Sequence, residues 1–95
     1  MNLEELEIIK KKALEEHIPI IMDDTLEVIE EKLKDIEVKR LLEIGTAVGY
    51  SAMCFSQFLD EDGKIDTIER DTERVTEARE NIKKVGVSEK INIIE

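Results

Sequence analysis

Cysteine, histidine and aromatic residues are scarce in this chain. Among its 95 residues there is one cysteine, Cys54, one histidine, His17, and three aromatic residues, Tyr50, Phe55 and Phe58. A lone cysteine excludes an internal disulfide, and a lone histidine cannot build a zinc site without partners. With so few aromatic side chains, the core is expected to be aliphatic, with Cys54 as a small buried core residue and His17 as a loop residue.

Basic residues are in deficit, with 14 Lys and Arg against 24 Asp and Glu, a net charge of −10. Phosphate binding needs clustered basic residues, so this balance argues against a nucleic-acid or membrane-surface role for this chain alone. The short run 10–12, three lysines, is interpreted as a solvated helix face.

Long apolar runs are also absent. The longest uncharged stretch, residues 44–59, contains two glycines and is shorter than the roughly 20 apolar residues that a membrane span needs. No transmembrane helix is therefore predicted. The first five residues carry acid where a secretory signal would carry base and an apolar run, which predicts a cytoplasmic protein.

Two helices are predicted before the first strand. The first helix, which Pro19 ends, has its apolar face at helical spacing in Leu3, Leu6, Ile9 (or Ile8), Ala13 and Leu14. Residues 17–22 are expected to be extended, because a residue before proline is pushed out of the helical region. The second helix is expected to be capped by Asp24, with Glu27 three residues later, and to bury Leu26, Ile29, Leu33 and Ile36.

From residue 38 the pattern alternates between strands and helices. The predicted elements are a strand Arg40–Ile44, a helix from about Tyr50 to Leu59, a strand Lys64–Glu69, a helix capped by Asp71 or Thr72 and stopped by Gly86, and a strand Ile91–Ile94. Right-handed crossovers would place the three strands in parallel, with the first strand at one edge.

The predicted fold class is therefore α/β: the N-terminal half of a Rossmann-like doubly wound parallel sheet, three strands with crossover helices, preceded by two helices. We expect one partial domain over residues 1–95, with an N-terminal helical cap at 1–37 and a βαβαβ half at 38–95.

The glycine turn Gly45–Gly49 is the strongest candidate for a ligand site. A tight turn between a strand and a helix presents backbone N–H groups and the positive end of the helix dipole above the sheet. Glu69, 24 residues after Gly45, ends the neighbouring strand and is placed to accept hydrogen bonds from ribose hydroxyls. A ligand with an adenosine and a charged tail would lie across this turn, although a tight turn without any ligand stays open as an alternative. The dinucleotide fingerprint needs three glycines, so NAD is the weaker interpretation.

Three segments of this chain resemble one known family. Residues 42–51, LEIGTAVGYS, resemble the first motif of class I S-adenosylmethionine-dependent methyltransferases, in the form found in caffeoyl-CoA, catechol and bacterial small-molecule or tRNA hydroxyuridine O-methyltransferases. Residues 67–71, TIERD, resemble the second motif. Residues 17–22 resemble the loop that precedes the capping helix of this family and closes over the cofactor. Nearly the whole chain is covered by the resemblance.

The resemblance implies S-adenosylmethionine as the cofactor and assigns a role to each matching residue. The methionine end of the cofactor would be held by Glu43 and by the turn residues Gly45, Thr46, Ala47 and Gly49, and Ser51 would bond the cofactor carboxylate. Glu69 would take the ribose hydroxyls and Arg70 would lie beside the adenine. Met22 or Ile21 would lie near the sulfonium. From the residues alone, Glu43 in a buried strand is expected either to be functional or to bond a helix terminus.

The resemblance also implies what this chain lacks. The catalytic and metal-binding residues of the family follow its later strands, so no catalytic residue and no metal ligand is assigned here. The chain would be the N-terminal part of an O-methyltransferase, inactive alone, whose full-length form takes a small-molecule or tRNA-nucleoside acceptor and possesses any divalent-metal site outside these residues. The alternatives are a non-catalytic half-domain or oligomerising unit without ligand, and thirdly an NAD-binding Rossmann unit.

A last expectation concerns assembly. The first strand would be an inner strand of a full sheet, apolar on both faces, but here its outer edge has no neighbour. We therefore predict a homodimer or higher oligomer, formed through that edge or through the two leading helices.

Overall fold

The computed structural model describes residues 1–95 and has seven elements. They are α1 (Leu3–Glu15), α2 (Asp23–Asp35), β1 (Arg40–Ile44), α3 (Tyr50–Ser56), β2 (Lys64–Ile68), α4 (Thr72–Val85) and β3 (Ile91–Ile94). The strands pair in parallel in the order β1-β2-β3. This confirms the predicted α/β class, the parallel sheet and the position of the first strand at an edge.

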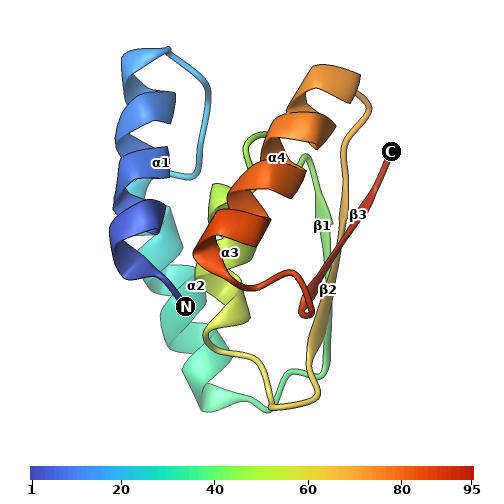
Figure 1. The fold of residues 1–95 in the computed structure, drawn as a ribbon. Coiled ribbons are helices and arrows are strands. Elements are labelled where there is room, and N and C mark those ends of the chain that lie inside the picture. Colours follow the sequence, from blue (N-terminus) through green and yellow to red (C-terminus); the bar gives the residue numbers. More distant parts are fainter.

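All four helices lie on the same side of the sheet (Figure 1). Helices α3 and α4 contact the strands, whereas α1 packs on α3 and α4, α2 packs on α3, and the two form an outer layer. The carboxyl ends of β1 and β2 and the connection from α1 to α2 lie toward the same end of the molecule (Figure 1). The fold thus brings residues 17–22 toward the glycine turn that follows β1.

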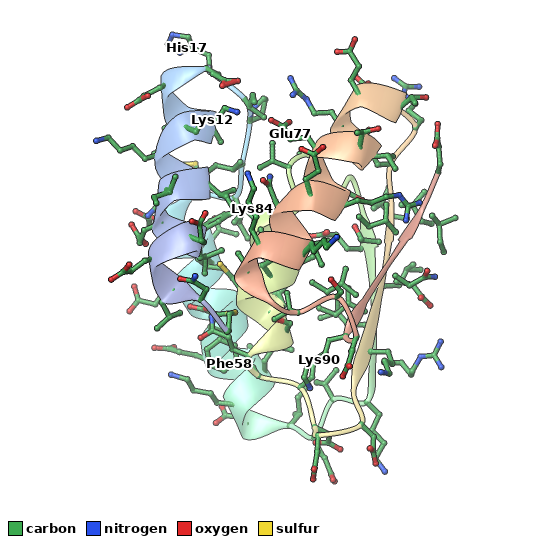
Figure 2. The ribbon with its side chains drawn as sticks, in the orientation of Figure 1. Lys12, His17, Phe58, Glu77, Lys84 and Lys90 are labelled. Atoms are coloured by element: carbon green, nitrogen blue, oxygen red, sulfur yellow. The ribbon has the colours of Figure 1, made fainter.

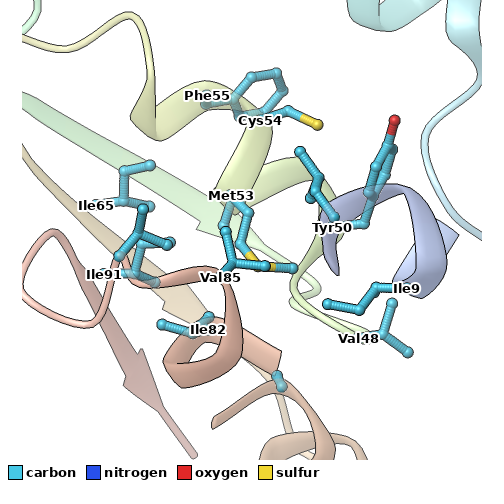
Figure 3. Packing of buried hydrophobic residues seen from close by; sticks show 14 of the residues in the cluster. Ile9, Val48, Tyr50, Met53, Cys54, Phe55, Ile65, Ile82, Val85 and Ile91 are labelled. Carbon is cyan, nitrogen blue, oxygen red and sulfur yellow. The ribbon is translucent and has the colours of Figure 1, made fainter. Parts of the chain in front are cut away.

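The core forms between the covered face of the sheet and the inner helices. Met53 of α3 and Ile65 of β2 are both 0% exposed, and Figure 3 shows them beside Ile82 and Val85 of α4 and Ile91 of β3. Since strand side chains alternate between faces, residues of the other face, such as Leu42 and Ile44, are exposed. The predicted aliphatic core is confirmed, but the sheet is covered on one face only.

Cys54 is buried in α3, as predicted, at 3% exposure. Figure 3 shows it near Tyr50 on the side of α3 away from Ile65. Burial raises the pKa of the Cys54 thiol to about 11, with the Tyr50 hydroxyl opposing the shift. The thiol is therefore a protonated core group at neutral pH. Among the four helices there is no candidate for a membrane-spanning segment.

The predicted apolar faces of the leading helices were too wide. Leu3 and Leu14 of α1 are 59% and 56% exposed, because α1 is covered only where it meets α3 and α4. Ile36 is 61% exposed and lies beyond the end of α2 in an extended conformation, so helical spacing no longer governs where it points. His17 is exposed and lies at the outer end of α1, pointing away from the sheet (Figure 2).

Two predicted helix limits were also wrong. Helix α2 begins at Asp23 with Met22 at the N-cap, and no side chain caps it. The Asp24 carboxylate accepts the N–H of the next residue, Thr25, at 2.8 Å, which takes it away from the N-cap role. Helix α3 ends at Ser56 rather than near Leu59, and the Ser56 hydroxyl donates to the Met53 carbonyl at 2.6 Å in its last turn. By contrast, Asp71 caps α4 and Gly86 ends it with φ of 88°, as predicted.

Candidate functional site

The turn after β1 is bonded to the end of the neighbouring strand. The backbone N–H groups of Gly45 and Thr46 both donate to the Ile68 carbonyl, at 2.7 and 3.2 Å. Gly45 and Gly49 have φ of 93° and 89°, and Ala47 between them has φ of 48°. A left-handed alanine is uncommon and costs energy, so this turn is held in place by its contacts.

Glu69 supplies one of those contacts from the end of β2. Its carboxylate accepts the Ala47 N–H at 2.9 Å through Oε1 and the Asp71 N–H at 3.1 Å through Oε2. The bond from Ala47 is the main reason that the pKa of Glu69 lies below its ordinary value. Glu69 is therefore an ionised carboxylate at neutral pH that lies against the glycine turn.

Glu43, in β1, is a partly buried carboxylate with hydroxyl partners. Ser51 in the first turn of α3 donates to Oε2, and Thr67 of β2 donates to Oε1 at 2.7 Å. Burial raises the pKa of Glu43, and the two hydroxyls oppose that shift. None of the four ion pairs of the structure includes Glu43. Its partners are side-chain hydroxyls and not the backbone of a helix terminus.

A cavity of about 160 Å³ separates the turn from the connection between α1 and α2. Its wall is formed by Pro19, Ile20, Ile21, Gly45, Thr46, Ala47, Tyr50 and Ser51. Small-molecule sites usually measure roughly 300–1,000 Å³, so this cavity has room for one end of a ligand. A Cβ built on Gly45 would meet no atom within 4 Å, which leaves open space beside the turn for the remainder.

The structure places the predicted site residues in four groups. Gly45, Thr46, Ala47 and Ser51 line the cavity, and Glu43 and Glu69 bond to residues of its wall. Gly49 is buried, at the start of α3. Arg70 is exposed after β2, and Met22 is 69% exposed at the α2 N-cap, outside the cavity wall. Of the two residues predicted to lie near the sulfonium, Met22 and Ile21, only Ile21 lines the cavity.

Sequence reasoning missed Thr67 and Ile20. Thr67 is 0% exposed and bonds both Glu43 and Thr46. Its signal was a hydroxyl residue at a core-facing position of an alternating strand, two residues before the acidic residue Glu69. Ile20 lines the cavity and its signal was the isoleucine pair that follows Pro19.

A larger hollow of about 300 Å³ lies at the opposite end of the molecule, lined in part by Ser56, Gly86 and Lys90. Figure 2 shows Lys90 at that end, near Phe58 and far from His17. The Lys90 ammonium donates to the backbone carbonyls of Asp60 and Glu61, at 3.3 and 3.4 Å. The Lys90 ammonium is thus already hydrogen-bonded to the turn before β2. We therefore place the candidate site at the other end of the molecule, at the carboxyl ends of the strands.

Comparison with known proteins gives a consistent result. The family described as O-methyltransferase matches residues 3–95. A caffeoyl-CoA O-methyltransferase from Populus kitakamiensis is 38% identical over 63 residues, which are 66% of this chain and 27% of the relative.

Two solved structures extend this likeness to nearly the whole chain. A Staphylococcus aureus protein assigned to the caffeoyl-CoA O-methyltransferases is 33% identical with a TM-score of 0.88, over 95% of this chain and 43% of that one. An S-adenosylhomocysteine-bound methyltransferase from Podospora anserina is 26% identical with a TM-score of 0.78, over 98% of this chain and 40% of that one.

The chain thus spans less than half the length of the relatives that it matches. The match of the family over residues 3–95 confirms the resemblance drawn from the three segments. This chain belongs to the O-methyltransferase family.

Proposed function

We propose that this chain carries the cofactor-binding part of an S-adenosylmethionine-dependent O-methyltransferase. The observation that carries the proposal is a pair of carboxylates bonded to the cavity wall: Glu69 accepts the N–H of Ala47 in the middle of the glycine turn, and Glu43 accepts the hydroxyl of Ser51 in the first turn of α3. When bound, the cofactor supplies a sulfonium methyl group for transfer to an oxygen of the acceptor.

The residues present fit such a cofactor. Glu43 is a partly buried carboxylate that has no cationic partner. It is hydrogen-bonded to Ser51, whose side chain lies between Glu43 and the cavity. A buried carboxylate is stabilised by an opposite charge, so this end of the cavity favours the amino group of a ligand. Glu69, ionised and partly exposed at the next strand end, is placed to accept ribose hydroxyls beyond the turn.

The other proposed contacts follow the cavity wall. Gly45, Thr46, Ala47 and Gly49 form the turn against which the methionine end lies, and Ser51 reaches the cavity from α3. We place Ile21, or Met22 beside it, toward the sulfonium and Arg70 toward the adenine. No group of three or more His, Cys, Asp or Glu side chains that could hold a metal ion is present among residues 1–95.

Parallel calorimetric titrations with S-adenosylhomocysteine and NAD test the proposal. We expect S-adenosylhomocysteine to bind more tightly, because the turn lacks the third glycine of the dinucleotide motif. The control is Gly45→Arg, which fills the open space beside the turn and is expected to bind neither ligand. Tighter binding of NAD would contradict the proposal.

A second candidate, a ligand-free half-domain, is favoured by the internal bonding of the site. The Ser51 hydroxyl is already engaged by Glu43, and the Ala47 N–H is engaged by Glu69. The same titration decides, because a ligand-free unit would bind neither compound. For either candidate we expect no methyl transfer by the 95-residue chain alone, to a small-molecule or a tRNA acceptor, because no catalytic residue is assigned within it.

We also propose that the chain is cytoplasmic, because a buried free thiol suits a reducing compartment.

We further propose that the chain self-associates through the β1 edge. At the other sheet edge, Arg79 donates to the Ile93 carbonyl of β3 at 3.4 Å and so occupies an edge acceptor. Strand β1 has no such protection, and its residues Leu42 and Ile44 are 66% and 75% exposed. An unprotected edge beside apolar side chains favours pairing with a second copy.

Sedimentation velocity at micromolar concentration measures this association. We expect a dimer for the native chain and a monomer for Leu42→Lys, which adds charge to the open face. The matched control is Ile8→Lys on the exposed side of α1, where the native side chain is 58% exposed and the dimer should persist. A compact monomer of the native chain would contradict the proposal.

A further inference from the structure

Thr67 has an environment that strand formation does not require. Its side chain is 0% exposed in the middle of the sheet, and it is the register partner of Glu43 on the neighbouring strand. A valine would suit the same strand position and would bring no polar atom into the core. A buried hydroxyl is costly unless it is hydrogen-bonded. The presence of threonine there calls for a reason outside the sheet itself.

The hydrogen bonds of Thr67 supply that reason. Its hydroxyl donates to Glu43 Oε1 at 2.7 Å, and it lies 2.7 Å from the hydroxyl of Thr46. A hydroxyl has one proton, so Thr67 must accept from Thr46 while it donates to Glu43. The bonds therefore run in one direction, from the glycine turn through Thr67 to the carboxylate. Ser51 completes the arrangement from the cavity wall by donating to the other oxygen of Glu43.

The hydrogen bonds from Thr46 through Thr67 to Glu43 link three parts of the candidate site. Thr46 belongs to the turn, Glu43 to β1 and Thr67 to β2, two positions before Glu69. Every buried side-chain nitrogen or oxygen has a hydrogen-bond partner, so each hydroxyl in this series is engaged. Removing the Thr67 hydroxyl would leave Thr46 without its acceptor and Glu43 Oε1 without its donor.

We propose that Thr67 is a positioning residue of the cofactor site, whose hydroxyl fixes the Glu43 carboxylate and couples it to the turn at Thr46. The proposal rests on the proposed function for the identity of the ligand. The geometric part, the orientation of Glu43, is independent of any ligand.

Two variants separate a positioning role from a packing role. Thr67→Val keeps the branched shape and removes the hydroxyl, whereas Thr67→Ser keeps the hydroxyl and removes a methyl group. In calorimetric titrations of the full chain with S-adenosylhomocysteine, we expect Thr67→Val to lower the affinity by about tenfold or more, the usual effect of losing a hydrogen bond to a charged group. Thr67→Ser should stay within about threefold of the native chain. A packing role predicts the opposite order.

The titration of Glu43 gives a readout that needs no ligand. Carbon-13 NMR of the Glu43 carboxyl should report a higher pKa in Thr67→Val than in the native chain, because the ionised form loses a donor. Thr67→Ser should leave it close to native. Where Thr67→Val does not fold, as judged by circular dichroism, Thr67→Ala replaces it because it introduces no new contact.

The outcomes distinguish the two proposals. An unchanged Glu43 titration in the variant without the hydroxyl overturns the positioning role. If the native chain binds no S-adenosylhomocysteine, the proposed function fails, and the Glu43 titration still decides on Thr67. If the native chain binds and Thr67→Val binds equally well, the positioning role is overturned while the proposed function stands.

Discussion

Replacing Glu43 with glutamine is expected to lower the affinity for S-adenosylhomocysteine by about 10–100-fold, the range for losing a charged partner of a ligand. Glutamine has nearly the same shape, so the loss would come from the charge. Calorimetry measures it, and Glu61→Gln, an exposed position in the turn before β2, is the matched control. Equal affinity of the Glu43 variant would contradict a role for its charge.

The same substitution is expected to stabilise the fold at neutral pH. Because burial raises the pKa of Glu43 above its ordinary value of 4.5, the folded chain holds this proton more tightly than the unfolded chain. The contribution of Glu43 to stability is therefore fully present below pH 4.5 and is lost as the pH rises through its folded-state pKa. Denaturant melts at several pH values should show Glu43→Gln gaining on the native chain as pH increases. A constant difference would contradict the raised pKa.

Replacing Glu69 with alanine is expected to reduce the affinity for the same ligand by about 1–3 kcal/mol, the cost of leaving ligand hydroxyls unpaired. It should also release the Ala47 amide, which Glu69 holds at 2.9 Å in a left-handed turn. Amide hydrogen exchange would detect faster exchange at Ala47. Undiminished affinity would mean that Glu69 is only a charge at the end of a strand.

Glutamine at position 69 separates the two effects. Its carbonyl oxygen can still accept the Ala47 N–H, so exchange at Ala47 should stay slow in Glu69→Gln. The charge is lost, so the affinity should fall toward that of the alanine variant.

The pKa of Glu69 lies below its ordinary value of 4.5, so its stabilising contribution is present above that pH and is lost as the pH falls through the folded-state value. Neither variant should show this acid dependence.

The elements could be predicted where a local pattern decides them. Strands β1 and β3 begin and end where alternation and flanking residues indicated, and Asp71 and Gly86 mark the limits of α4. These features depend on residues within about four positions of one another. Ile36 was misplaced because its exposure depends on where α2 ends and not on its spacing from Leu33.

The site was predicted less completely than the fold. The turn and Glu69 follow from the order of strands, because parallel strands bring their carboxyl ends to one edge. The partners of Glu43 do not follow, since they depend on the register of β1 against β2 and on the rotation of α3. Likewise, Ile21 and not Met22 lines the cavity, and Met22 is instead the N-cap residue of α2, a limit that the sequence had placed at Asp24.

The burial of Cys54 has a practical consequence for studying this protein. Thiol reagents react with the thiolate, and a buried thiol with a pKa of about 11 presents almost none at neutral pH. A single cysteine introduced at an exposed position, such as His17 at the outer end of α1, can therefore be labelled selectively without first removing the native one. A fluorophore there would lie two residues from Pro19, which belongs to the cavity wall, and its emission could be used to follow the filling of the cavity by a ligand.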